Sequence, residues 1–162
     1  MLKRIEAIQN IMNIVDDNTI VISSCGRISR EVYTVKDRPL NFYVLGSMGS
    51  TLPIAMGIGI CKPERDIIVI AGDGEILMDL GSLVLLNKLQ KTDKLPNLEL
   101  YILDNNQYQS TGGQKTISDF CKFRLLCDCK VIPVSPEDSE LSRIPLKPVE
   151  IKERFMKALQ EN

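Results

Sequence analysis

The chain of 162 residues is 44% hydrophobic and 25% charged, with a formal net charge of −1, and this balance is ordinary for one soluble globular domain. This charge balance implies no nucleic-acid or membrane-surface partner. Because the sequence lacks a long apolar stretch and a secretion-signal pattern, we expect a cytoplasmic protein. There is no histidine, so the common histidine-containing zinc sites and any imidazole-based catalytic triad are excluded as well.

The hydrophobic pattern predicts strands and helices that alternate along the chain. In chain order, we expect a helix over residues 2–15, strands over 19–23 and 41–45, a closely packed helix that begins near residue 50, a strand over 66–71, a helix over 75–90, a strand over 98–103, a helix over 118–127, a strand over 130–134 and a helix over 148–159. The strand over 66–71 is apolar on both faces, which is typical of a central parallel strand. Together these elements indicate a three-layer α/β/α domain with a mainly parallel sheet, which we expect to span residues 1–162.

Polar, glycine-rich segments follow four of the predicted strands. In chain order they read SSCG, GSMGS, GDGE and DNNQYQSTGG. In an open parallel sheet, ligands bind beyond the carboxyl ends of the strands. We therefore expect these loops to converge on one crevice.

The GDGE segment and the asparagines after the next strand favour a metal–phosphate site. Gly72 and Gly74 permit a tight turn, Asp73 places a carboxylate at the strand end, and Asn105 follows the neighbouring strand. A carboxylate, an amide oxygen and a main-chain carbonyl are hard ligands that suit Mg²⁺, which a diphosphate would complete. A dinucleotide site is less well supported, because the pattern G-x-G-x-x-G is absent after the candidate strands.

Several blocks of the sequence resemble one known family. The run GDGEILMDLGSLVLLNKLQKTDKLPNLELYILDNN is similar to the thiamine-diphosphate signature, in which GDG is followed by a helix, a strand and an asparagine pair or its variant. With NFYVLGSMGSTLPIAMGIGI, LDNNQYQSTGGQ and IPLKPVEIKERF, the chain resembles the diphosphate-binding half of phosphonopyruvate and sulfopyruvate decarboxylases over residues 5–155. The resemblance implies the thiamine-diphosphate-binding fold and a thiamine-diphosphate- and Mg²⁺-dependent decarboxylase. Its substrate would be a 3-substituted pyruvate: phosphonopyruvate, giving phosphonoacetaldehyde, or sulfopyruvate, giving sulfoacetaldehyde, with release of CO₂.

The resemblance also implies residue roles at the diphosphate end of the cofactor. Asp73 would bind Mg²⁺ through its carboxylate, Asn105 through its side-chain oxygen and Gln107 through its main-chain carbonyl. The residues implied in diphosphate binding are Gly72, Asp73, Gly74, Glu75 and Ser110. Ser110 and Thr111 either contact the phosphonate or sulfonate of the substrate or only shape the loop, with cationic partners of the substrate coming from another subunit.

Three further residues are implied at the ring end of the cofactor. The Gly46 carbonyl would accept a hydrogen bond from the 4′-amino group, and Met48 would be the apolar wedge that keeps the two rings folded together. From composition alone, a plain core methionine is the favoured interpretation of Met48. Tyr108 stands where many relatives carry histidine, so it is either a catalytic proton donor or hydrogen-bond donor to substrate, or a packing residue.

One catalytic part has no counterpart in this sequence. In the resembled family, a glutamate from a pyrimidine-binding domain activates the cofactor, and Glu75 belongs beside the diphosphate. We therefore expect a separate pyrimidine-binding (alpha) subunit that supplies this glutamate, and a hetero-oligomer in which the present chain is the beta subunit.

Other functions stay open at this level. The chain is alternatively a half-subunit of another thiamine-diphosphate-dependent 2-oxo acid lyase or synthase, a non-catalytic scaffold subunit of such a complex, or an unrelated metal–phosphate enzyme on a doubly wound sheet. Ser29, Arg30 and Glu31 resemble a patterned segment of the decarboxylase subgroup, but the sequence assigns them no role. We expect the cysteines, including Cys127 and Cys129, to be structural.

Overall fold

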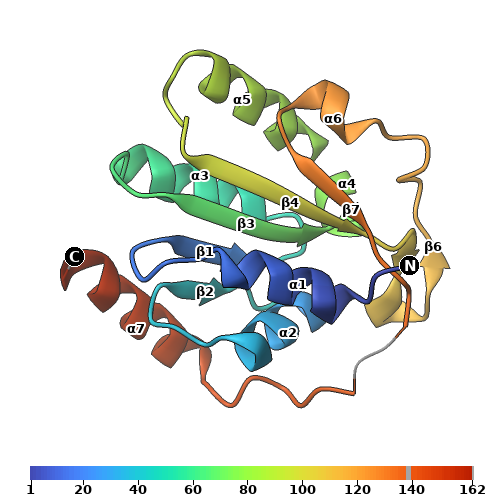
Figure 1. Ribbon diagram of the computed structural model, residues 1–162, viewed down its shortest axis with the longest axis horizontal. Coiled ribbons are helices and arrows are strands. Elements are labelled where there is room, and N and C mark those ends of the chain that lie inside the picture. The colour runs from blue at the N-terminus through green and yellow to red at the C-terminus, as the bar shows by residue number, and fades with distance from the viewer. Residues whose placement is uncertain (138–139, 162) are drawn as a thin grey trace.

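A five-stranded sheet forms the centre of the chain in the computed structural model, which describes residues 1–137 and 140–161. The strands are β1 (Ile20–Ser23), β2 (Asn41–Tyr43), β3 (Ile67–Gly72), β4 (Leu98–Asp104) and β7 (Lys130–Pro133). They lie in the order β2-β1-β3-β4-β7, and all four neighbouring pairs are parallel. The carboxyl ends of the strands, four of which carry the predicted polar loops, therefore point to one edge of the sheet (Figure 1).

Both faces of the sheet are buried, as the sequence predicts for a parallel sheet. Along β3, Ile67, Val69 and Ala71 belong to one core cluster, whereas Ile68 and Ile70 belong to the other. This alternation follows from the two-residue period of a strand, which points successive side chains to opposite faces. A strand with two apolar faces must be covered by helices on both sides.

The helices supply these two cover layers. The first core cluster lies under α3 (Thr51–Cys61), α5 (Leu80–Lys91) and α6 (Phe123–Leu126), and the second lies under α1 (Arg4–Asn13) and α2 (Arg27–Val35). The final helix, α7 (Pro148–Glu161), packs along β2 at the edge of the sheet (Figure 1). There the ring centroids of Phe155 and Phe42 lie 5.1 Å apart. The predicted three-layer architecture is confirmed. No helix among the described residues combines the length and apolar character that crossing a membrane requires.

The structure corrects the sequence-based prediction at two helices. Helix α2 was not predicted, because its apolar stripe is narrow and charged residues interrupt the segment RISREVYTV. The helix predicted over 75–90 is two helices, α4 (Asp73–Leu77) and α5, separated by Met78 and Asp79. Asp79 leaves the helical region (φ −141°, ψ 57°), and its carboxylate accepts a hydrogen bond from the Ser82 hydroxyl in the first turn of α5.

The segment after β4 also differs from the prediction. The helix expected over 118–127 is only one turn, α6, while the expected loop contains a small hairpin, β5 (Gln107–Tyr108) and β6 (Gln114–Lys115), joined by a 3₁₀ turn, η1 (Gln109–Thr111). The positive φ angles of Gly112 and Gly113 permit the reversal. This hairpin folds over the ends of the central strands and forms part of the candidate site.

Candidate functional site

A cavity of about 180 Å³ opens at the carboxyl ends of the central strands. It is lined by residues from all four polar segments that the sequence analysis singled out, among them Gly26 after β1, Met48 after β2, Asp73 after β3 and Asn105 after β4. The predicted convergence of these loops on one crevice is therefore confirmed. The geometry follows from the all-parallel sheet, because its strand ends share one edge.

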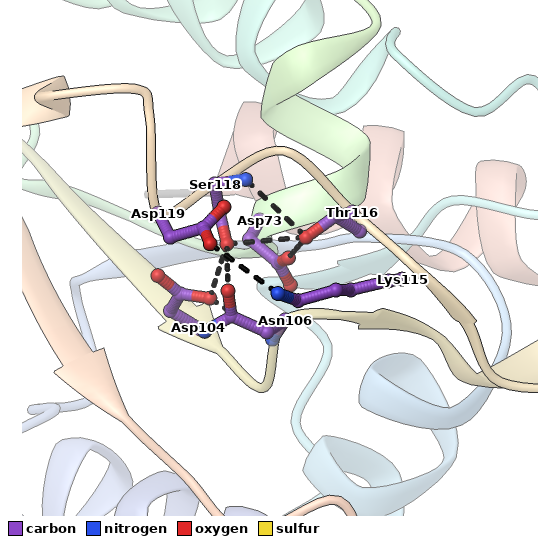
Figure 2. Close-up of polar contacts among 7 residues, drawn as sticks. All are labelled: Asp73, Asp104, Asn106, Lys115, Thr116, Ser118 and Asp119. Atoms are coloured by element: carbon purple, nitrogen blue, oxygen red, sulfur yellow. Dashed lines mark hydrogen bonds and ion pairs between the residues drawn. The ribbon is translucent and has the colours of Figure 1, made fainter.

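Asp73 is the most deeply buried acidic side chain of the cavity, with 2% of its surface exposed. The Thr116 hydroxyl donates a hydrogen bond to Asp73 Oδ2 at 2.5 Å, and Figure 2 shows the two side chains pointing toward each other. Burial raises the pKa of the Asp73 carboxyl, and nearby Asp104 adds to this, while the Thr116 bond opposes it. A bound divalent cation would offset both the burial and the repulsion.

A tight turn after β4 places the second predicted metal ligand. The backbone N–H of Asn106 and the hydroxyl of Ser118 both donate to Asp104 Oδ1, at 3.1 and 2.9 Å (Figure 2). Asn106 adopts φ +57°, a conformation that asparagine tolerates better than most residues. Asp104 thus organises the turn that directs Asn105 toward the cavity.

Asn105 and Gln107 line the same cavity as Asp73. The Asn105 side-chain oxygen accepts a hydrogen bond from the Gln107 N–H at 3.0 Å, and a carbonyl oxygen keeps a second lone pair for another partner. No cluster of three or more histidine, cysteine or carboxylate ligands occurs in the described residues, so the candidate set is of a different type: one carboxylate, one amide and one main-chain carbonyl. These are ligands that fit Mg²⁺.

Gly74 forms the floor of the cavity beneath two side chains. A Cβ atom at this position would lie 2.6 Å from Tyr108 Cε1 and 3.4 Å from Met48 Cε. Only glycine therefore lets the first turn of α4 pass this close under the Tyr108 ring. Gly74 lines the cavity, so its predicted contact with a diphosphate stays a prediction that its position permits.

The residues predicted at the ring end lie in an exposed loop. Gly46, Ser47 and Gly49 all have positive φ angles, and the side chain of Met48 is 41% exposed while it lines the cavity. The alternative that Met48 is a core methionine is therefore wrong. Gly46 is exposed and is not among the cavity-lining residues, so the role of its carbonyl stays a prediction.

The predicted site residues of the hairpin, Tyr108, Ser110 and Thr111, differ in their packing, exposure and hydrogen bonding. Tyr108 packs closely over Gly74 and lines the cavity, so its packing role is seen directly, while its role as a donor to the substrate stays a prediction. Ser110 is exposed and lies next to Gly26, where an added Cβ atom would be 3.3 Å from the Ser110 hydroxyl oxygen. Thr111 bonds the Tyr108 carbonyl at 3.2 Å and Gln114 at 3.0 Å, which shapes the turn.

The side chain of Glu75 is engaged within the protein. Its Oε1 atom accepts hydrogen bonds from the Thr51 N–H at 3.1 Å and from the Thr51 hydroxyl at 2.5 Å, which ties α4 to the start of α3. The Cys25 sulfur lies 4.0 Å from Oε2, and burial together with the charge of Glu75 raises the pKa of this thiol. Because the Glu75 carboxylate is bonded to Thr51, only the backbone of Glu75 is available to contact a diphosphate.

Sequence reasoning missed several residues that line or support the cavity. Thr116 and Ser118 are small polar residues in an irregular segment, which carry no recognisable signal. Arg4 did carry one, because it occupies the apolar stripe of α1 in line with Ile8 and Ile11. The other cavity-lining residues that lie outside the four predicted polar segments are Arg27, Ile28 and Leu103.

A family model identifies the cofactor, and a solved structure shares the fold. Residues 24–125 match the family described as thiamine pyrophosphate enzyme, C-terminal TPP binding domain. The benzoylformate decarboxylase of Polynucleobacter necessarius shares the fold with a TM-score of 0.65 at 12% identity, covering 88% of this chain and 34% of that one. At this identity the structural likeness concerns the fold alone.

Two curated relatives match over nearly their whole length. The sulfopyruvate decarboxylase subunit beta of Methanothermobacter thermautotrophicus is 35% identical, covering 99% of this chain and 97% of the relative. The subunit of the same name from Methanocaldococcus jannaschii is 36% identical, with 99% and 98% covered. The phosphonopyruvate decarboxylase of Streptomyces viridochromogenes is 38% identical over 71% of this chain and 28% of its own length. The chain therefore belongs to the thiamine-diphosphate-dependent decarboxylases, as a diphosphate-binding subunit of the beta type.

Proposed function

We propose that this chain is the beta subunit of a thiamine-diphosphate- and Mg²⁺-dependent decarboxylase that converts a 3-substituted pyruvate to the corresponding aldehyde and CO₂. Sulfopyruvate is the substrate that the full-length relatives favour, and phosphonopyruvate is the alternative. The observation that carries the proposal is the buried carboxylate of Asp73 in a cavity that it shares with Asn105 and Gln107.

The residues at the β3 and β4 ends fit a diphosphate bound through a metal ion. Asp73, the Asn105 side-chain oxygen and the Gln107 carbonyl would hold the cation, and the backbone around Gly74 would face the phosphate oxygens. When bound, thiamine diphosphate supplies the carbon nucleophile for the 2-oxo acid and accepts the electron pair released with CO₂. The contribution of this chain is to position the cofactor and to neutralise its charge.

Met48 and Tyr108 would act at the reacting end. Met48 lines the cavity with its sulfur-bearing side chain half exposed, as expected for a wedge that becomes covered only by a ligand. Tyr108 places a phenol over Gly74, where its hydroxyl would donate a proton or a hydrogen bond to the substrate. Both side chains would also exclude water from the closed site.

We further propose that a pyrimidine-binding alpha subunit completes the site with an activating glutamate. Two features support this partner. The relatives that match over their whole length are named as beta subunits. The two carboxylates that line the cavity, Asp73 and Glu75, are already bonded by Thr116 and Thr51, so neither is placed for a second role at the ring end.

We also propose a cytoplasmic location. All five cysteines are free thiols, which supports it.

Reconstitution with the partner subunit tests the proposal. The complex should release CO₂ from sulfopyruvate or phosphonopyruvate only when thiamine diphosphate and Mg²⁺ are both present, and it should prefer one of these substrates to pyruvate. Asp73→Ala should abolish the activity. Full activity of a complex that carries Asp73→Ala would instead indicate a scaffold subunit, and activity of this chain without the partner would refute the proposed division of the site.

A further inference from the structure

Arg4 is a buried charge on the apolar face of α1, with 5% of its surface exposed. Glu31 of α2, which is 1% exposed, accepts two hydrogen bonds from it, Nε to Oε2 at 2.7 Å and Nη2 to Oε1 at 2.8 Å. Burying an ion pair costs desolvation energy that an apolar pair of similar size avoids, so stability alone does not account for it. Arg4 also lines the cavity.

The third nitrogen of the Arg4 guanidinium reaches the loop after β4. Arg4 Nη1 donates a hydrogen bond to Gln109 Oε1, while Gln109 Nε2 donates to the Pro136 carbonyl at 2.7 Å. These partners permit only one orientation of the Gln109 carboxamide, because a flipped group would set its NH₂ against the Arg4 donor and its oxygen against the Pro136 carbonyl.

The orientation of the Gln109 carboxamide in turn fixes the orientation of the Asn105 carboxamide. The same Gln109 Oε1 atom accepts a hydrogen bond from Asn105 Nδ2 at 3.3 Å, and Asn105 Oδ1 accepts from the Gln107 N–H at 3.0 Å. If the Asn105 carboxamide were flipped, its oxygen would face Gln109 Oε1 and its NH₂ group would face the Gln107 N–H. Both contacts would be repulsive. The Asn105 oxygen therefore faces the Gln107 backbone, where the third proposed metal ligand lies.

We propose that Glu31, Arg4 and Gln109 are positioning residues that fix the orientation of the Asn105 carboxamide so that its oxygen is presented to the divalent cation. This inference rests on the proposed role of Asn105 as a metal ligand. It also assigns a role to Glu31, for which the sequence offered none, and it explains why a costly buried pair stands beside the cavity. We call this chain of hydrogen bonds from Glu31 through Arg4 and Gln109 to Asn105 the relay. It begins with charge-assisted hydrogen bonds from Arg4, which are stronger than neutral ones and so hold the Gln109 carboxamide firmly.

The test measures thiamine diphosphate binding to the assembled complex by equilibrium dialysis over a series of Mg²⁺ concentrations. Gln109→Met removes the link while keeping the side-chain length, and it should raise the Mg²⁺ concentration at half-saturation at least about tenfold. Arg4→Met should do the same and should also lower the unfolding temperature, because it removes two buried hydrogen bonds to the Glu31 carboxylate.

The double variant Arg4→Met/Glu31→Leu separates positioning from stability. An apolar pair should restore the unfolding temperature, whereas the raised Mg²⁺ requirement should persist. Arg154→Met is the matched control, since Arg154 forms a similar two-bond pair with Asp37 at 2.7 and 2.9 Å but does not line the cavity. It should leave the Mg²⁺ requirement unchanged.

Two outcomes would overturn the inference, and Asn105→Ala distinguishes them. If Asn105→Ala raises the Mg²⁺ requirement but Gln109→Met and the double variant do not, the relay is wrong while the proposed metal site stands. If Asn105→Ala leaves the requirement unchanged, Asn105 is no ligand, and the relay and the proposed metal site fail together.

Discussion

The two ends of the cavity are built in different ways. At the β3 end, Asp73 and Glu75 are buried and each carboxylate accepts a short hydrogen bond from a threonine. At the β2 end, the loop from Leu45 to Gly49 is largely exposed, and three of its residues have positive φ angles. The proposed diphosphate end is thus held by hydrogen bonds within this chain, whereas the proposed ring end is an exposed loop, which fits completion by a partner subunit.

Loss of the Asp73 charge should give the largest effect. We expect Asp73→Asn to lower the rate of decarboxylation by about 10³-fold or more, because the proposed ligand set then contains no negatively charged side chain.

The same change should raise the unfolding temperature of the cofactor-free chain at neutral pH, since burial raises the pKa of Asp73 and its ionised form is costly. The folded state then binds the proton more tightly than the unfolded state, so the gain should shrink as the pH falls through the pKa of this carboxyl. A thermal melt at several pH values checks the sign, and a lower unfolding temperature at neutral pH would contradict it.

A substitution at the proposed ring end should lower the activity without changing the stability of the chain. Met48→Ala should lower kcat by about 10- to 100-fold, as expected for a lost positioning contact, while the unfolding temperature of the free chain stays nearly constant because the side chain is half exposed. Met156→Ala, at a comparably exposed methionine on α7, is the matched control and should change neither quantity. A large loss of stability in Met48→Ala would place this residue in the core after all.

The floor of the cavity should tolerate little added volume. A methyl group in Gly74→Ala would overlap the Tyr108 ring and displace it, so we expect about a tenfold rise in the thiamine diphosphate dissociation constant. Gly74→Ala/Tyr108→Ala removes the overlap and should recover part of the affinity. Equal affinities for the single and double variants would show that the clash with the ring is not the cause.

The smallest expected effect concerns the support of Asp73. Thr116→Val removes the hydrogen bond that lowers the pKa of the Asp73 carboxyl, so this pKa should rise further. If the reaction requires ionised Asp73, the acid limb of the pH–activity profile should move to higher pH, with an activity loss of a few-fold at neutral pH. Thr92→Val on the exposed end of α5 is the control. A shift of the acid limb to lower pH would contradict this account.

The sequence predicted the layers, the parallel sheet and the convergence of the loops, because buried strands and glycine-rich strand ends leave local patterns. It did not predict α2, whose narrow apolar stripe is Ile28 and Val32, nor the break between α4 and α5 at Asp79, where side-chain bonding to Ser82 competes with helix continuation. It also missed the Arg4–Glu31 pair, since nothing local links positions 27 residues apart. The supporting residues of the site were therefore the least predictable part.

The most direct test of the central claim is the position of a metal ion in the assembled complex. Crystals grown with thiamine diphosphate and Mn²⁺ in place of Mg²⁺ would locate the ion by its anomalous scattering. We predict one ion about 2.1–2.2 Å from an Asp73 carboxylate oxygen, the Asn105 side-chain oxygen and the Gln107 carbonyl, with the diphosphate bound to the same ion. A diphosphate bound with Asp73 free of metal, or an ion held elsewhere, would contradict the account.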